Sequence, residues 1–381
     1  MKLLRYLAPL LLGTITAQAV GDQFDQFVFV GTQAGPKNSS KGIYVFGLDS
    51  QTGKMQPLGL AAKAKNPNFL ALSPNKKFLY TVSAGDGKEG GVSSYSIDPQ
   101  TGTMTFLNQQ SSKGKGPCHV SVDATGKVLL VANYSSGTIA SLPIHADGSL
   151  GEAASSHIHG PASKVDAGRQ NAPYAHSINP DQSGKFAFAC DLGCDKIFSY
   201  RLDLAGAKLT PNDPPFAVVP PGGGPRHFAF HPTGKFAWAN NEMTLTVTGF
   251  KYEADQGALA PLETVSTLPP GVSVIPAYST AETQAHPNGN FLYVSNRGHD
   301  TIACFRVDQT TGKLTFIEAA PSLVQVPRNF GIDPTGKWLI AAGNRGGGIA
   351  VFAIDQATGK LSPTGQQFEV DAAVCVKFLQ R

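Results

Sequence analysis

An arginine and a glutamate flank a predicted β-hairpin in the stretch GGGPRHFAFHPTGKFAWANNE, residues 222–242. Arg226 and His227 stand before its first apolar run, Glu242 stands after the second, and a His-Pro-Thr-Gly turn lies between the runs. Because the two strands of a hairpin are antiparallel, Arg226 and Glu242 meet at its open end. A guanidinium beside a carboxylate can bind an anion and support proton transfer, or it can form a structural ion pair.

The same hairpin pattern occurs in five other segments, which are residues 68–84, 119–134, 176–193, 283–298 and 329–344. A second signature, a strand that leads into a glycine turn, occurs seven times, at Gly53, Gly102, Gly148, Gly206, Gly257, Gly312 and Gly359. The intervals of 46 to 58 residues between these glycines leave room for four strands per repeat. Repeats of this length and content are typical of a β-propeller.

The two ends of the chain supply the seventh hairpin. FVFVGT, residues 27–32, matches the second strands of the other hairpins, and AVCVKF, residues 373–378, matches their first, inner strands. Pairing of these segments would close the ring and cover two sheet edges. The sequence therefore predicts an all-β fold, a seven-bladed β-propeller closed by the C-terminal strand pairing with the N-terminal blade.

Neighbouring hairpins of such a ring bring further polar residues to the rim that carries Arg226 and Glu242. The starts of first strands supply His119, His176, Glu282 and Arg328, and the ends of second strands supply Asn133, Asp191, Arg297 and Asn344. A mouth with three arginines, two glutamates and one or two histidines suits a small polyanion and an acid–base reaction. The alternative is that Arg226 and Arg297 pair with the glutamates to hold blades in register. We expect His227 to point away from the channel.

The first 19 residues, MKLLRYLAPLLLGTITAQA, have the pattern of a secretory signal peptide. Two basic residues precede an apolar run that is too short to span a bilayer, and Ala-Gln-Ala ends the segment as a small-x-small cleavage site. We expect cleavage near Ala19, which leaves residues 20–381 as a single propeller domain with no membrane span. The mature protein is then exported, to the periplasm or the extracellular space.

Composition and motifs exclude several functions. Loss of Lys2 and Arg5 with the leader lowers the formal net charge from +4 to +2, and no basic cluster with interleaved aromatic residues supports nucleic-acid binding. There is no G-x-S-x-G elbow, H-E-x-x-H or P-loop motif, and no convincing set of metal ligands. Five cysteines in an exported chain leave at least one free or paired outside the chain. We expect a monomer with neither metal nor cofactor.

The chain resembles the seven-bladed propeller lactonase family, which includes propeller-type 6-phosphogluconolactonases and fungal carboxy-muconate cycloisomerases. The resemblance rests on GGGPRHFAFHPTGKFAWANNE, FLYVSNRGHDTIACFRVD, VPRNFGIDPTGKWLIAAGN and the repeated D-x-x-T-G-K-L, and it extends over about residues 27–378. It implies an active site with one histidine, two arginines and a glutamate. These fall on His176, Arg226, Glu242 and Arg297. The chain departs from many relatives at Tyr174, where they carry a second histidine, and at Asn344.

This resemblance implies a lactonase that acts on a small anionic lactone. Hydrolysis needs a base for water, here Glu242 or His176, and cations for the developing oxyanion, here Arg226 and Arg297. His119, Glu282, Arg328 and Asn344 are then expected to bind the substrate. Two alternatives stay open: a cycloisomerase that forms a lactone with His176 as proton donor, and a propeller without catalytic activity that binds a partner.

Overall fold

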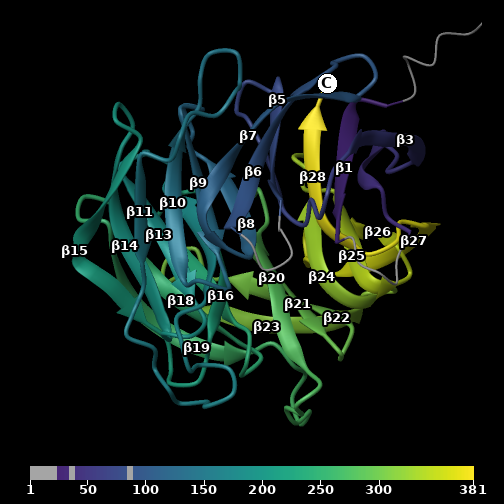
Figure 1. Ribbon diagram of the computed structural model, residues 1–381. Coiled ribbons are helices and arrows are strands. Elements are labelled where there is room, and N and C mark those ends of the chain that lie inside the picture. Colours follow the sequence, from purple (N-terminus) through teal and green to yellow (C-terminus); the bar gives the residue numbers. More distant parts are fainter. Residues whose placement is uncertain (1–23, 34–38, 84–88) are drawn as a thin grey trace, which may run out of the picture.

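The fold is a ring of seven four-stranded antiparallel sheets in a computed structural model, which describes residues 24–33, 39–83 and 89–381 (Figure 1). No helix occurs among these residues. The predicted all-β, seven-bladed propeller is therefore confirmed. The predicted signal peptide and its cleavage site lie outside the described residues.

Each sheet is one blade, with its inner strand beside the channel. From the channel outwards, blade 1 contains β28 (Ala373–Gln380), β1 (Gln26–Thr32), β2 (Gly42–Leu48) and β3 (Met55–Lys63). Blade 2 contains β4 (Leu70–Leu72), β5 (Phe78–Ser83), β6 (Glu89–Ile97) and β7 (Met104–Lys115). Blade 3 contains β8 (Pro117–Val122), β9 (Val128–Asn133), β10 (Thr138–Pro143) and β11 (Ser155–Ile158). Blade 4 contains β12 (Ala175–Pro180), β13 (Phe186–Asp191), β14 (Lys196–Asp203) and β15 (Lys208–Val218).

The remaining three blades have the same arrangement. Blade 5 contains β16 (Pro225–Phe230), β17 (Phe236–Asn241), β18 (Thr246–Glu253) and β19 (Ala258–Ser266). Blade 6 contains β20 (Ser279–Ala285), β21 (Phe291–Arg297), β22 (Thr301–Val307) and β23 (Leu314–Pro321). Blade 7 contains β24 (Gln325–Ile332), β25 (Trp338–Gly346), β26 (Ile349–Ile354) and β27 (Leu361–Phe368).

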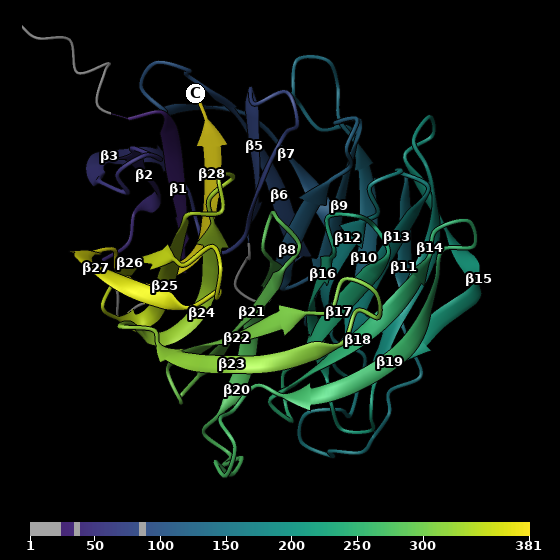
Figure 2. The same cartoon turned by 180° about the vertical axis from the view of Figure 1, so that it is seen from behind.

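The last strand of the chain closes the ring. Strand β28 pairs antiparallel with β1, from Gln26 opposite Gln380 to Thr32 opposite Ala373. Both cartoon views show the yellow C-terminal strand beside the purple N-terminal one (Figures 1 and 2). The predicted pairing of residues 373–378 with residues 27–32 is confirmed. It satisfies backbone groups that would otherwise form two open sheet edges.

The repeated glycine turns have a packing reason. Gly312 has a φ of 72°, and a Cβ at this position would lie 2.4 Å from the Phe236 ring of the preceding blade. The same close approach joins Gly257 to Phe186 and Gly359 to Phe291. Each turn therefore needs glycine twice, for its left-handed backbone and for the aromatic ring of the neighbouring blade. The same glycine–aromatic contact therefore sets the distance between successive blades at each of these turns.

β-Bulges interrupt the inner strands of six blades close to one rim. The register skips one or two residues of the inner strand there, and these residues are Cys118, His176, Arg226 with His227, Ala281 with Glu282, Val326 and Arg328, and Val374. Side chains of the second strand fill two of the gaps: Asn240 accepts a hydrogen bond from the His227 amide, and Ser295 accepts one from the Glu282 amide, both at 3.0 Å. A bulge bends the strand and redirects its side chains, here at the channel.

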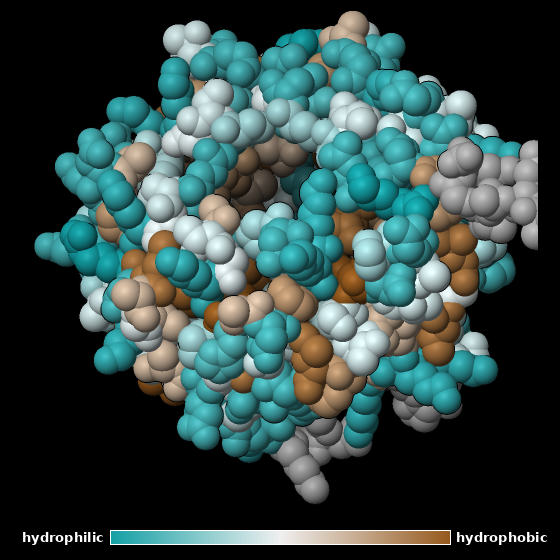
Figure 3. Space-filling model, turned by 90° about the horizontal axis from the view of Figure 1, so that it is seen from above, coloured by the Kyte–Doolittle hydropathy of each residue, from teal (hydrophilic) through white to brown (hydrophobic). Residues whose placement is uncertain are grey.

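The molecule is hollowed near its middle when it is seen from above (Figure 3). Hydrophilic residues cover most of the rim in this view, and apolar residues lie at the depth of the hollow. In the described part of the chain there is no helix with the length and apolar character needed to cross a membrane.

Candidate active site

Glu242 is the centre of a buried cluster of arginines. Its side chain is 7% exposed, and its Oε2 lies 2.9 Å from Nε of Arg226 and 3.0 Å from Nη2 of Arg297. Its Oε1 lies 2.6 Å from Nη2 of Arg169. The hairpin geometry thus brings together Arg226 and Glu242 as expected, and the next blade adds Arg297. One carboxylate neutralises only one of these three guanidinium charges.

The arginines control the ionisation of Glu242. Burial alone would raise the pKa of this carboxyl, but Arg297, Arg226 and Arg169 outweigh burial and lower the pKa to about 2. Glu242 is therefore a carboxylate throughout the physiological pH range, and it is a weak base. Both of its oxygens are also occupied by guanidiniums, which favours His176 over Glu242 as the group that deprotonates water.

The glycine-rich loop before β16 fixes the position of Arg226. The carboxylate of Asp195 accepts hydrogen bonds of 2.8 Å from the amides of Gly222 and Gly224. Gly224 has a φ of 65°, and its carbonyl accepts a hydrogen bond of 2.8 Å from the amide of Glu242. The chain then enters the bulge of β16, where Nη1 of Arg226 donates a hydrogen bond to the carbonyl of Ala281. Arg226 is held by its loop, its bulge and the neighbouring blade.

Arg169 is a site residue that the hairpin repeats do not predict. It lies in the segment between β11 and β12, where the carboxylate of Asp166 accepts hydrogen bonds from the amides of Gly168 and Arg169. The next residue, Gln170, donates from Nε2 to Asp195 at 2.6 Å. Asp195 therefore anchors both the loop of Arg226 and the loop of Arg169. The Arg169 side chain is 45% exposed, so it covers Glu242 from the solvent side.

A cavity of about 280 Å³ adjoins Glu242 at this rim. His176, Arg297 and Arg328 line it, together with Cys118 and Tyr134. Arg328 makes no ion pair or hydrogen bond within the described ranges 24–33, 39–83 and 89–381. Burial, followed by the charge of Arg297, lowers the pKa of Arg328. An unpaired guanidinium in a small cavity is a binding site for an anion.

His176 is a neutral base candidate in the same cavity. Burial, followed by the charges of Arg226, His227 and Arg328, lowers its pKa well below the usual range for histidine. Nδ1 lies 3.9 Å from Sγ of Cys118, and the ring meets Tyr134 edge-on with the centroids 5.4 Å apart. The lowered pKa keeps the imidazole neutral, with a lone pair that can accept a proton from water, and makes it a weaker base than a free histidine.

Tyr134, which lines this cavity, is stacked against Tyr174. The rings of Tyr134 and Tyr174 stack with their centroids 4.9 Å apart, and Tyr134 also interacts with Arg169. Tyr174 donates from its hydroxyl to Asn171 at 2.6 Å. Tyr174, one of the two predicted departures from the family pattern, therefore contributes to the packing of Tyr134.

The structure separates the other predicted rim residues from Glu242. Asn344 donates to Gln33 at 3.3 Å and is not among the residues that line the cavity. His119 and Glu282 line a different cavity, together with His227. Their roles in substrate binding stay predictions.

The expected orientation of His227 is wrong. Its ring lies in the channel, with its centroid 5.3 Å from that of His176 and 5.5 Å from that of His119. Nδ1 of His227 lies 3.0 Å from Oε2 of Glu282. The bulge of β16 explains the difference, because the side chains of two consecutive residues there no longer alternate between opposite faces.

The cysteines and the acidic residues offer no further site chemistry. All five cysteines lie in the described part of the chain and are free, and burial raises the pKa of Cys118 to about 12. A thiol with such a pKa is a poor nucleophile at neutral pH. Over the described residues, no three His, Cys, Asp or Glu side chains are grouped so that they could hold a metal ion.

Comparison with known proteins agrees with this fold. The family described as "Lactonase, 7-bladed beta-propeller" matches residues 27–378. The chain is 37% identical to a 6-phosphogluconolactonase of Bacillus subtilis over 353 residues, which are 93% of this chain and 98% of the relative. A solved structure of a putative 6-phosphogluconolactonase from Bacteroides fragilis superposes with a TM-score of 0.86 at 35% identity, with 93% of this chain and 98% of the other covered. The structure of a periplasmic gluconolactonase from Pseudomonas aeruginosa superposes with a TM-score of 0.85 at 33% identity, with 93% and 99% covered. The chain belongs to the lactonase family of seven-bladed β-propellers.

Proposed function

We propose that this lactonase hydrolyses a small anionic lactone of the sugar-acid type, such as 6-phosphogluconolactone. The observation that carries the proposal is the excess of positive charge at one cavity. Arg169, Arg226, Arg297 and Arg328 surround a single carboxylate, and Arg328 has no partner in the described residues. A bound anion would compensate this excess, and planar guanidiniums fit phosphate and carboxylate groups with two hydrogen bonds.

The reaction follows from the placement of His176 and the arginines. Neutral His176 takes a proton from a water molecule, and the oxygen of that water attacks the lactone carbonyl carbon. The carbonyl oxygen becomes an oxyanion that the guanidinium of Arg297 stabilises, while Arg328 holds the anionic group of the substrate. The bond from the carbonyl carbon to the ring oxygen then breaks, and the ring oxygen receives the proton from the His176 imidazolium. The product is an open-chain hydroxy acid.

Glu242 serves this reaction as a positioning residue. Its two oxygens hold Arg169, Arg226 and Arg297, and its lowered pKa keeps it charged while it does so. The lactonase relatives and structures support lactone hydrolysis, and they add no support for a cycloisomerase or for a propeller that only binds a partner.

The Arg328→Met variant tests the class of substrate. We expect KM for 6-phosphogluconolactone to rise about tenfold or more, because one charge-assisted hydrogen bond to the anion is lost. The KM for uncharged gluconolactone should change little. A pH-indicator assay with each lactone gives the two KM values, and their ratio is compared between the variant and the wild type. The melting temperature should hold or rise, since Arg328 faces the charge of Arg297 without a partner of its own in the described residues.

The matched control is Arg345→Met, which removes an exposed arginine of the same blade. We expect it to leave both KM values unchanged. If Arg328→Met affects the charged and the uncharged lactone equally, the proposed selectivity for an anionic substrate is wrong.

We also propose that the enzyme works outside the cytoplasm after removal of residues 1–19. The basic, apolar and small-residue regions of this segment support export, as does the similarity to a protein described as periplasmic. Intact-mass measurement of the protein from its native host should give Val20 as the first residue. A cytosolic protein that retains residues 1–19 would contradict this proposal.

A further inference from the structure

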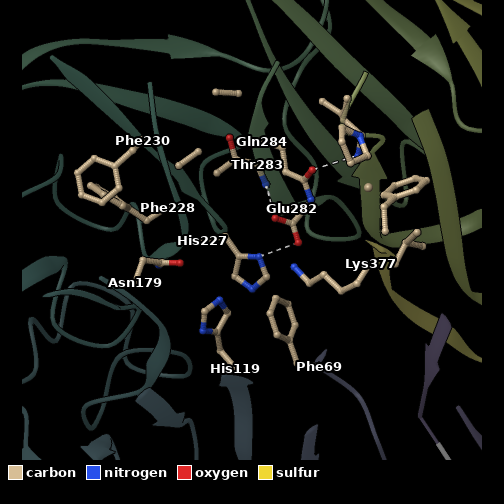
Figure 4. A pocket seen from close by; sticks show the side chains of 17 residues that line it. Phe69, His119, Asn179, His227, Phe228, Phe230, Glu282, Thr283, Gln284 and Lys377 are labelled. Atoms are coloured by element: carbon tan, nitrogen blue, oxygen red, sulfur yellow. Dashed lines mark hydrogen bonds and ion pairs between the residues drawn. The ribbon is translucent and has the colours of Figure 1, made fainter. Parts of the chain in front are cut away.

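A second cavity, of about 380 Å³, has a lining that does not include Glu242, and Figure 4 shows it from close by. Two inner strands reach both cavities: the later residues Asn179 of β12 and Ile332 of β24 line this one, and the earlier residues His176 and Arg328 line the cavity beside Glu242. The two cavities therefore open toward opposite faces of the ring.

A layer of four rings lies between the two cavities. Phe69 packs on His119 with centroids 4.3 Å apart, and both rings contact His227, at 5.4 and 5.5 Å. His176, which lines the cavity beside Glu242, contacts His227 from the other side at 5.3 Å. A ligand in one cavity is therefore separated from a ligand in the other by packed side chains.

Lys377 supplies a positive charge to the second cavity. Its Nζ lies 4.9 Å from the centre of the Phe69 ring, and no carboxylate in the described part of the chain lies within ion-pair distance of it. Figure 4 shows this amine pointing into the space beside Glu282 and His227. An ammonium in this position is available to an anion.

Glu282 supplies a fixed hydrogen-bonding carboxyl on the facing wall. Its Oε2 is held by Nδ1 of His227 at 3.0 Å and by Nδ2 of Asn329, and its Oε1 accepts the amide of Thr283 at 3.2 Å. Burial raises its pKa to about 7, although Lys377 and Arg226 act in the opposite direction. The carboxyl can therefore accept a hydrogen bond from a ligand hydroxyl, and its protonated form can donate one.

Other polar atoms in the wall have unused hydrogen-bonding capacity. Nδ1 of His119 accepts the amide of Ile178 at 3.3 Å, which leaves the protonated Nε2 as a donor. Oγ1 of Thr283, in a residue only 2% exposed, and Nδ2 of Asn179 are buried without a hydrogen-bond partner among the described residues. Buried polar atoms are normally satisfied, so these two make the wall more polar than its packing requires.

We propose that this second cavity binds a small hydroxy-carboxylate, with its carboxylate at Lys377 and its hydroxyl groups at Glu282 and His119. A single lysine opposite a carboxyl suits a monoanion with hydroxyls, because Glu282 would repel the second charge of a phosphate. The rings of Phe69 and Phe378 and the side chain of Ile332 cover the carbon skeleton. The site is independent of the lactone chemistry at the other end of the channel.

Titration calorimetry with D-gluconate on the full-length enzyme tests the proposal. Lys377→Met should weaken gluconate binding about tenfold or more, since it removes the charged partner of the carboxylate and keeps the apolar stem over Phe69. Lys235→Met is the matched control, because Lys235 is an exposed lysine in the blade 5 hairpin turn and lines no part of the cavity. We expect it to bind gluconate as the wild type does.

A second comparison separates this site from the cavity beside Glu242. Arg328→Met should leave gluconate binding at the second cavity intact, and Lys377→Met should leave lactone hydrolysis unchanged. A crystal soaked with gluconate should show the ligand beside Lys377. The proposal is overturned if millimolar gluconate does not bind to the wild type, if Lys377→Met binds it as well as wild type, or if only Arg328→Met weakens binding.

Discussion

His176→Gln should lower kcat/KM for the preferred lactone by about 10²- to 10⁴-fold, the range typical for loss of a general base. Glutamine keeps a polar amide of similar length but cannot accept the proton of water. The melting temperature should change little, because the contact from Nδ1 to the Cys118 sulfur is long, at 3.9 Å. A continuous lactonase assay and thermal unfolding of the same preparations measure both quantities.

The pH profile of the wild-type enzyme gives a second readout of the same role. The pKa of His176 is lowered, so the neutral form that acts as a base persists as the pH falls below the ordinary histidine range. We therefore expect kcat/KM to stay level to below about pH 6.5 and to fall only as the pH passes through the lowered pKa. If His176 were instead a proton donor, as the cycloisomerase hypothesis requires, the enzyme would be active only at pH values below the pKa of His176.

The control for His176→Gln has to lie away from the channel. His227 is unsuitable, because its ring packs against His176 and it is bonded to Glu282. His145→Gln changes an exposed histidine in the turn after β10, and we expect it to keep full activity. If His176→Gln retains wild-type kcat/KM, the base is another group and the proposed mechanism is wrong.

The seven-bladed ring could be predicted from the sequence because its repeats contain a turn that favours glycine. Gly312 and its counterparts recur because an aromatic ring of the adjacent blade packs against each turn. Counting these glycines therefore gives the number of blades. The pairing of β28 with β1 could be predicted for a similar reason, since two unpaired half-hairpins stand at the two ends of the chain.

The direction of individual side chains could not be predicted in the same way. Alternation along an ideal strand places Arg226 and His227 on opposite faces, whereas the bulge of β16 turns both into the channel. Glu282 occupies the equivalent bulge of β20 and lines the second cavity, whereas Glu242, the ion-pair partner of Arg226, lines the first. Bulges depend on contacts between blades, such as Asn240 Nδ2 with Thr280 Oγ1 at 2.8 Å, and these have no signature in the local sequence.

Arg169 could not be predicted from the hairpin pattern. It lies in an insertion, and the one available signal is the interval from Gly148 to Gly206, the longest of the repeat spacings at 58 residues. Extra residues in a propeller repeat form loops on one face, where they reach over the channel. An arginine in the longest such loop is therefore a reasonable candidate for the site.

Glu242→Gln should both destabilise the fold and reduce activity. The substitution keeps the shape of the side chain and removes the negative charge that three guanidiniums share. Removal of one partner from a buried ion pair costs about 3 to 5 kcal/mol, because it leaves an uncompensated charge. The same interaction seen as a pKa change from 4.5 to about 2 corresponds to about 3 kcal/mol. Activity should fall at least tenfold as Arg226 and Arg297 move apart.

The pH dependence of the loss of stability in Glu242→Gln identifies its cause. The pKa of Glu242 is lower in the folded state than in the unfolded state, so its ion pairs stabilise the fold fully above pH 4.5, and this contribution is lost as the pH falls toward 2. The difference in melting temperature between wild type and Glu242→Gln should therefore shrink as the pH falls below about 5. Glu253→Gln, which breaks an exposed pair with Lys251, is the control and should cost at most about 1 kcal/mol. A Glu242→Gln variant that melts like wild type at neutral pH would show that the carboxylate does not hold the arginine cluster together.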